Sequence, residues 1–153
     1  MNNSGIDNNK AVSMLNDLLT RNYDAEKGYQ QAADEVDDTR LKTFFHTKAK
    51  ERYDFGHTIK DEIRNLGGSP DKGTSIKGDM HRAWMDLRES IASHDEKAIL
   101  EECERGEKAA LKDYNDLLNN GVPMTTKSVI ERQRDSIQRD LREIQDMEVT
   151  YTK

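Results

Sequence analysis

Apolar side chains recur every three or four residues along most of the chain, and this spacing predicts amphipathic helices. The first stripe includes Leu15 and Leu19, and the last includes Ile137 and Ile144. Glycine and proline separate the stripes, because glycine accepts the left-handed conformation that ends a helix and proline cannot continue one. The pattern therefore predicts four long helices, over residues of about 10–36, 39–66, 95–119 and 124–149.

The lengths of the connections predict how these helices are arranged. The first and second helices are joined by a few residues, as are the third and fourth, and short links make antiparallel neighbours. About 28 residues join the second helix to the third, and they include a shorter helical pattern over about 76–92. We therefore expect an all-α, ferritin-like four-helix bundle of two antiparallel hairpins, joined by a long crossover that contains a short extra helix. Residues 10–150 should form this single domain, after a flexible, asparagine-rich N-terminus over 1–9.

Composition excludes several classes of protein. Of the 153 residues, 33% are hydrophobic and 35% are charged, and no apolar run approaches the length of a membrane span. The net charge of -6 argues against binding to the phosphate backbone of nucleic acids. The single cysteine excludes an intramolecular disulfide and a cysteine-based zinc site. The first ten residues lack the basic and apolar segments of a signal peptide, so none is expected.

Several carboxylates occupy positions where the helical pattern would place an apolar residue. Glu26 lies seven residues after Leu19, and Glu51 lies seven residues after Phe44. In the third helix, Glu104 and Glu107 adjoin the apolar stripe. A carboxylate that turns into the core must be protonated, paired with a cation or bound to a metal.

A metal site is one interpretation of these acids. Ferritin-like di-iron proteins take one Glu from each of two helices and a Glu-x-x-His motif from each of the other two. Carboxylate and imidazole ligands suit iron and manganese, so Fe or Mn is the cofactor expected if any is bound. The pattern is incomplete here, because no Glu-x-x-His occurs and Asp54 stands where a histidine would follow Glu51. The candidate ligands are Glu26, Glu51, Asp54, Glu104 and Glu107.

A structural polar layer is the alternative interpretation. Glu26, Glu51 and Glu107 could pair with cations of facing helices and so fix the register of the bundle. Candidate cations are Arg52, Arg105 and Arg134. The sequence contains no glycine-rich phosphate loop and no nucleophilic catalytic motif, which favours a protein that is not an enzyme.

Two further features indicate partners rather than chemistry. Met80 and Trp84 share one stripe of the short crossover helix, where they either plug the side of the bundle or form a surface for a protein partner. Long helices with apolar flanks, here at Phe44 or Phe45, often pair, so a homodimer is expected. No nucleic-acid or membrane partner is expected.

Several segments also resemble a known family. They are Asp24–Tyr29, His81–Trp84, Ile99–Glu107 with the following Tyr114, and Gln133. Over nearly its whole length the sequence resembles the bacterial ferritin-like four-helix-bundle proteins of unknown function, whose fold is similar to that of ferritins and rubrerythrins. The resemblance implies this fold and the bacterial cytoplasm, and it supplies no reaction. Members often carry a histidine late in the fourth helix, near the position that Leu141 holds here.

Three functional hypotheses follow. The leading one is a soluble, non-enzymatic bundle whose polar core layer is a degenerate metal site. The second is a di-metal carboxylate protein with oxygen or peroxide chemistry. The third is an interaction module that uses the crossover helix.

Overall fold

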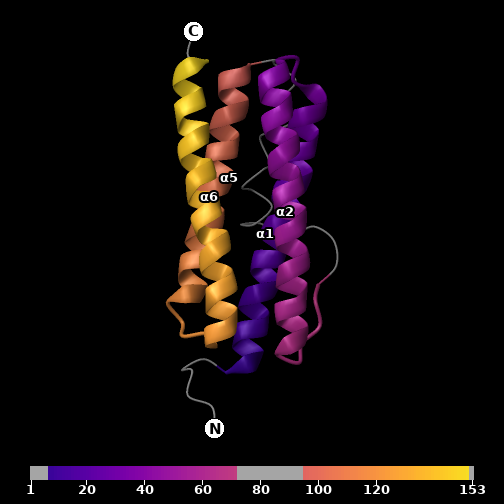
Figure 1. The fold of residues 1–153 in the computed structure, drawn as a ribbon, viewed down its shortest axis with the longest axis vertical. Helices are drawn as coiled ribbons and strands as arrows, with labels where there is room; N and C mark the ends of the chain where they lie inside the picture. The colour runs from indigo at the N-terminus through magenta and orange to yellow at the C-terminus, as the bar shows by residue number, and fades with distance from the viewer. Residues whose placement is uncertain (1–6, 72–94, 152–153) are drawn as a thin grey trace.

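The computed structural model describes residues 7–71 and 95–151, and these residues form four α-helices (Figure 1). The helices are α1 (Asn8–Glu35), α2 (Thr39–Asn65), α5 (Glu96–Leu118) and α6 (Met124–Thr150). Their ends lie within two residues of those that the periodicity predicts. Helices of this length extend about 40 Å, so each runs the length of the molecule.

The helices form two antiparallel hairpins, α1–α2 and α5–α6, as their connections predict (Figure 1). α1 runs away from the end that holds the N-terminus, α2 returns, α5 runs parallel to α2, and α6 returns to the far end. The expected all-α, ferritin-like bundle of two antiparallel hairpins is therefore confirmed. The short helix expected over 76–92, with Met80 and Trp84, lies outside the described residues. None of the helices in the described part of the chain is long and apolar enough to cross a membrane.

Aspartate side chains cap the N-termini of three helices. Asp7 accepts a hydrogen bond from the Lys10 amide, so helix α1 begins inside the segment that was expected to be flexible. Asp38 accepts from the Leu41 amide at 3.0 Å and begins α2. Asp95 begins α5 in the same way. A carboxylate at this position satisfies a free amide of the first turn and complements the positive end of the helix dipole.

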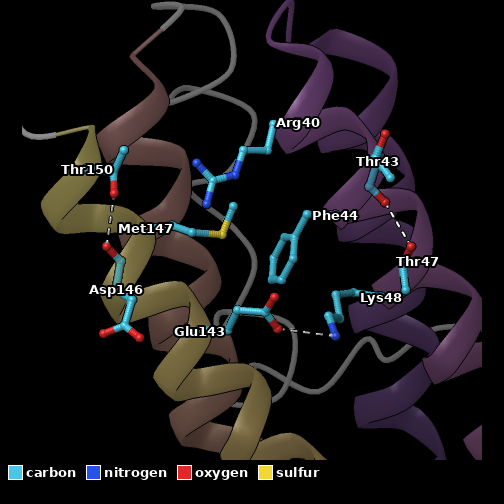
Figure 2. Close-up of a pocket in the computed structure, with 9 residues that line it drawn as sticks. All are labelled: Arg40, Thr43, Phe44, Thr47, Lys48, Glu143, Asp146, Met147 and Thr150. Carbon is cyan, nitrogen blue, oxygen red and sulfur yellow. Dashed lines mark hydrogen bonds and ion pairs between the residues drawn. The ribbon is translucent and has the colours of Figure 1, made fainter.

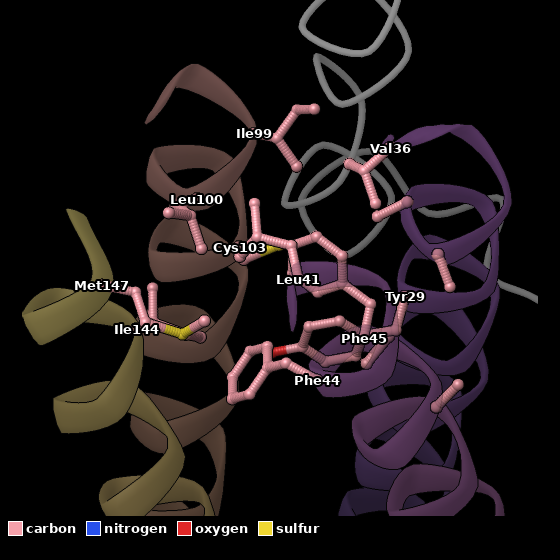
Figure 3. Close-up of a cluster of buried hydrophobic side chains, with 14 residues drawn as sticks. Tyr29, Val36, Leu41, Phe44, Phe45, Ile99, Leu100, Cys103, Ile144 and Met147 are labelled. Carbon is pink, nitrogen blue, oxygen red and sulfur yellow. The ribbon is translucent and has the colours of Figure 1, made fainter. Parts of the chain in front are cut away.

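The apolar core consists of two clusters, one toward each end of the bundle. In the cluster beside the α1–α2 turn, residues of all four helices meet, among them Tyr29, Phe45, Cys103 and Ile144 (Figure 3). The other cluster includes Leu15, Leu18, Leu19, Ile59, Tyr114, Leu117 and Ile137. Phe44 and Phe45 are 8% and 0% exposed. They pack inside the bundle, so the prediction that they form an exposed dimer flank is wrong.

The turn after α2 depends on two consecutive glycines. Gly67 has φ +86°, a conformation that residues with a Cβ rarely adopt. The Gly68 amide donates to the Ile63 carbonyl at 2.9 Å, which draws the turn against α1. A Cβ on Gly68 would lie 2.5 Å from Cγ1 of Val12. Because valine is stiff at χ1, it cannot easily give way.

We predict that Gly68→Ala lowers the free energy of unfolding by about 1–3 kcal/mol, the usual cost of overpacking. Gly56→Ala is the matched control, because its Cβ would meet only Leu19 Cδ1, at an ordinary 3.6 Å. There the change should be neutral or should stabilise by up to about 1 kcal/mol, through helix propensity. Urea denaturation followed by circular dichroism measures both, and equal effects would contradict the proposed steric role.

Candidate functional site: a buried ion cluster

An arginine side chain lies in the polar band between the two apolar clusters. Arg52 is 1% exposed, although Phe45 and Ile59, seven residues before and after it, are apolar. Its Nη1 donates to Oε1 of Glu107 at 2.6 Å, and its Nη2 donates to Oε2 of Glu107 at 2.7 Å. Nη2 also donates to Oδ2 of Asp140 at 2.8 Å. The guanidinium of α2 thus joins carboxylates of α5 and α6.

Groups from the remaining sides complete this arrangement. From α1, the Tyr29 hydroxyl donates to Glu107 Oε2 at 2.6 Å. Nζ of Lys48 lies 2.8 Å from Asp140 Oδ1 and 3.7 Å from Glu143 Oε1. Figure 2 shows this lysine reaching from α2 toward Glu143 on α6, beside the ring of Phe44. We define the ion cluster as Tyr29, Lys48, Glu51, Arg52, Glu107 and Asp140.

Glu51 belongs to the cluster as a neutral acid. Burial and a hydrogen bond to Asp140 raise the pKa of Glu51 to about 8, so at neutral pH Glu51 keeps its proton and donates a hydrogen bond to the Asp140 carboxylate. The same hydrogen bond, with the charges of Arg52 and Lys48, outweighs burial and lowers the pKa of Asp140. Two cations, Lys48 and Arg52, therefore face two carboxylates, Glu107 and Asp140. The charge of the cluster sums to zero.

The pKa shifts of Arg52, Tyr29 and Lys48 favour the protonation states that this pairing requires. Burial acts to lower the pKa of Arg52, but the charge and hydrogen bonds of Glu107 raise it well above its ordinary value. Burial and the charge of Glu107 raise the pKa of Tyr29 well above its usual range. For Lys48, burial is outweighed by Asp140, and the pKa rises. At neutral pH the cations remain charged and the tyrosine remains protonated.

A second polar layer lies one heptad along the bundle. Nδ2 of Asn22 donates to the Tyr114 hydroxyl at 2.9 Å, and that hydroxyl donates to Oε1 of Gln133 at 2.6 Å. Nε2 of Gln133 donates to the Phe55 carbonyl at 3.3 Å. This layer is uncharged and uses its side-chain donors and acceptors internally. Gln133, which contributes to the family resemblance, is therefore a bridge between α5 and α2.

The predicted metal ligands of α2 and α5 are already engaged with other partners. Both oxygens of Glu107 accept from Arg52, and Glu51 is bonded to Asp140. Asp54 is exposed and lies 3.4 Å from Nζ of Lys50. Glu104 contacts Lys108 at 2.9 Å and shares a hydrogen bond with Glu148, a carboxyl whose pKa is raised to about 7 by burial and by Glu104.

The candidate ligands do not form one site. Glu26 experiences the charges of His57 and Lys60, on the face where α1 meets α2, and burial raises its pKa. Within the described residues, no group of three or more His, Cys, Asp or Glu side chains could hold a metal ion. The convergence that the di-metal hypothesis requires of Glu26, Glu51, Asp54, Glu104 and Glu107 is therefore not found there. The physical reason at Glu107 is that a guanidinium occupies the space between the acids.

The three candidate cations pair with different kinds of partner. Arg52 pairs with Glu107, as the polar-layer interpretation predicts. Arg105 pairs with Glu102 of its own helix, and Arg134 pairs with its neighbour Asp135. Arg134 also donates to Oδ1 of Asn115 on α5 at 3.1 Å, an exposed contact outside the core layer.

Sequence reasoning missed Tyr29, Lys48 and Asp140 as members of the site. A signal for Asp140 and for the buried Arg52 was present in the seven-residue spacing. One series on this spacing is Gln133, Asp140 and Met147, and the other is Phe45, Arg52 and Ile59. Charged residues at seam positions of two helices indicate a buried pair. Acids at such positions were named as candidate ligands, whereas Arg52 was named only as a candidate partner and not as a seam residue.

We predict that Glu107→Gln lowers the free energy of unfolding by about 3–5 kcal/mol, because it leaves the Arg52 guanidinium buried without its bidentate partner. The double variant Arg52→Met/Glu107→Met should recover much of this loss, since a well-packed apolar pair avoids desolvating charge. Lys112→Met is the control. It removes an exposed pair with Asp116 and should change stability by less than about 1 kcal/mol. Additive effects of Arg52→Met and Glu107→Met in urea denaturation would contradict a coupled pair.

The titration of Glu51 predicts a pH dependence of stability. The folded state keeps this acid protonated up to about pH 8, whereas the unfolded chain ionises it near 4.5. The unfolded state therefore binds fewer protons in this window, and stability falls as pH rises through it, by at most about 1.4 kcal/mol per pH unit.

Glu148, whose pKa is raised to about 7, adds a slope of the same sign at lower pH. Between pH 7 and 8 the slope should therefore fall in Glu51→Gln to the end of the Glu148 titration, which fades toward pH 8, and most of it should persist in Glu148→Gln. Urea midpoints measured across this range test the assignment. An undiminished slope near pH 8 in Glu51→Gln would show that another group causes it.

Comparisons with known proteins agree with this fold. A solved structure titled a dodecameric thioferritin, the bacterioferritin-related protein from Bacteroides fragilis, has a TM-score of 0.77 and 19% identity, and the match covers 95% of this chain and 88% of that chain. At this identity the likeness shows the fold alone. No curated protein matches the chain. A family model described as a domain of unknown function, DUF2383, matches residues 10–120, which span α1, α2 and α5. The expected resemblance to a ferritin-like family of unknown function is confirmed, and the chain belongs to the DUF2383 family.

Proposed function

We propose that the protein is a non-enzymatic ferritin-like bundle in which the ion cluster takes the structural place of a metal site. The observation that carries the proposal is the bidentate pairing of Arg52 with Glu107, shared with Asp140. A metal ion in such a bundle would neutralise inward carboxylates of several helices. Here a guanidinium, which remains charged at all ordinary pH values, neutralises them.

The donor set of the cluster does not suit a metal. Both oxygens of Glu107 and both oxygens of Asp140 already accept from Arg52, Lys48 or Tyr29. A divalent ion would have to displace buried cations, and repulsion from them would weaken its binding. The cluster also carries no surplus negative charge to attract it. These arguments favour a structural role over the di-metal hypothesis.

The buried nucleophile and phenols support the same proposal. Cys103 is 0% exposed, and burial together with the charges of Glu107 and Glu102 raises its pKa well above the ordinary value. A reactive cysteine needs the opposite, an accessible thiol with a lowered pKa. Burial also raises the pKa of Tyr114 above its ordinary value, which makes it a poor proton donor at neutral pH. We therefore assign these groups to packing and hydrogen bonding.

Location and assembly are part of the proposal. The bacterial cytoplasm follows from the family resemblance given above. The homodimer remains a prediction, and burial of Phe44 and Phe45 means that another surface would have to form it. The Bacteroides fragilis protein is named as dodecameric, so assembly of this chain is best tested by light scattering across a range of protein concentrations.

Metal content tests the proposal. The purified protein is treated with chelator, offered Fe(II), Mn(II) or Zn(II) without oxygen, desalted and analysed by elemental mass spectrometry. We expect far less than one metal ion per chain, and a thermal midpoint that is the same with metal and with chelator. The physical reason is that the carboxylates are already neutralised.

Two variants make the outcome specific. Glu26→Gln and Glu107→Gln each remove one predicted ligand, the first from α1 and the second from α5. One or two ions per chain, lost in both variants, would overturn the structural role and establish the di-metal hypothesis. Metal that is retained equally in both variants would come from surface carboxylates.

A further inference from the structure

A groove follows the side of the bundle between α2 and α6. These two helices pack least closely among the neighbouring pairs of the described bundle. Residues of both helices line a first cavity, which Figure 2 shows beside Phe44 and Met147, and a third cavity, whereas α2 alone lines a second. The first and second cavities share Thr47, and the second and third share Phe55. The cavities therefore follow one another along α2, and Lys48 and Glu51 of the ion cluster line the first and the second.

The third cavity has the features of a small-molecule site. It has a volume of about 430 Å³, which is within the usual range for ligand sites. Phe55 and Val129 give it apolar walls from α2 and α6. The Phe55 ring is also contacted from inside the bundle, where the Arg52 guanidinium lies 5.7 Å from the ring centroid.

Two arginines give this cavity a positive charge. Arg132 and Arg139 lie seven residues apart on α6, so they share a face and are about 10 Å apart along the helix axis. Within residues 7–71 and 95–151, neither arginine forms an ion pair with a carboxylate. Asp135 also lines the cavity, but its carboxylate is paired with Nε of Arg134 at 2.9 Å. In a chain with a net charge of -6, this is a local surplus of two cations.

The neighbouring hydroxyls define which hydrogen bonds remain available. Nη2 of Arg139 donates to Oγ of Ser136 at 3.0 Å, which leaves the hydroxyl proton of Ser136 free to donate. The hydroxyl of Thr58 donates to the Asp54 carbonyl at 3.2 Å, so it can only accept from a ligand. The α6 side of the cavity thus offers donors, and the α2 side offers an acceptor and an aromatic ring.

We propose that this cavity binds a phosphorylated small molecule, with the phosphate on α6 and the uncharged part against Phe55. A phosphate has enough oxygens to accept from both guanidiniums and from Ser136, and arginine binds such groups through two parallel hydrogen bonds. The acceptor at Thr58 suits a hydroxyl or amino group of the same molecule. The proposal goes beyond the structural role of the ion cluster and is independent of it.

Isothermal titration calorimetry at low salt tests the proposal with four probes. They are inorganic phosphate, adenosine monophosphate, adenosine and citrate. We expect saturable binding of adenosine monophosphate, weaker binding of phosphate, and none of adenosine. Arg132→Gln and Arg139→Gln should each weaken the binding of adenosine monophosphate by about tenfold or more, the effect of losing a hydrogen bond to a charged group.

Matched controls separate a site from general attraction to positive charge. Arg142→Gln changes the charge of the same helix by the same amount outside this cavity, and should alter the affinity less than about twofold. For the double variant Arg132→Gln/Arg139→Gln, the control is Arg40→Gln/Arg142→Gln. Equal losses in variants and controls would overturn the proposal, as would the absence of saturable binding by both phosphorylated probes. Citrate binding as tightly as adenosine monophosphate, with the same dependence on Arg132 and Arg139, would overturn the assignment to phosphate.

Discussion

The buried guanidinium of Arg52 is the constraint on which the rest of the bundle depends. A charge that is 1% exposed is tolerated only with full pairing, because transfer from water costs several kcal/mol. Its partners lie on α5 and α6, and Tyr29 of α1 joins through Glu107. Sliding α2 by one turn would separate the guanidinium from both carboxylates. Apolar contacts hold the helices together, but they would tolerate such a shift far better, so the ion cluster supplies the register.

The position of the cluster also explains the open side of the bundle. Lys48 and Glu51 lie at its edge toward α6, where Lys48 reaches Asp140 and Glu143 across the gap. Long polar side chains span a wider separation than interlocking apolar ones do, so α2 and α6 remain the least closely packed pair. The groove is thus a consequence of pairing these helices through charges. Phe55 then borders both the buried guanidinium and the cavity at Arg132 and Arg139.

Periodicity predicted the four helices and their directions because burial requires one apolar face on each. The residue that caps α2 was harder to predict than its start, because the side chains of both Asp38 and Thr39 could accept from the first turn, and the structure uses Asp38. Within the site, one interpretation of the sequence paired Glu107 with a cation of a facing helix, with Arg52 as one of three candidates, and the structure pairs these two. The sequence pattern placed Glu51 at the seam, but adjacent helical residues point about 100° apart, and Arg52 occupies the central direction. Which neighbour turns inward is decided by contacts with α5 and α6, which one helix's pattern does not contain.

A guanidinium and a metal ion give the same bundle a different stability and a different reactivity. A metal binds reversibly, so a metal-centred core is stable only when the ion is available, and its open coordination positions admit oxygen or peroxide. Arg52 is covalently part of the chain, and its two terminal nitrogens are held by Glu107 and Asp140. If this guanidinium takes the place of a metal, as we propose, the core is independent of metal supply and offers no open coordination position for activating a small molecule. Recognition would then take place at the surface, and the groove between α2 and α6 is where polar groups with unused hydrogen-bonding capacity meet an apolar wall.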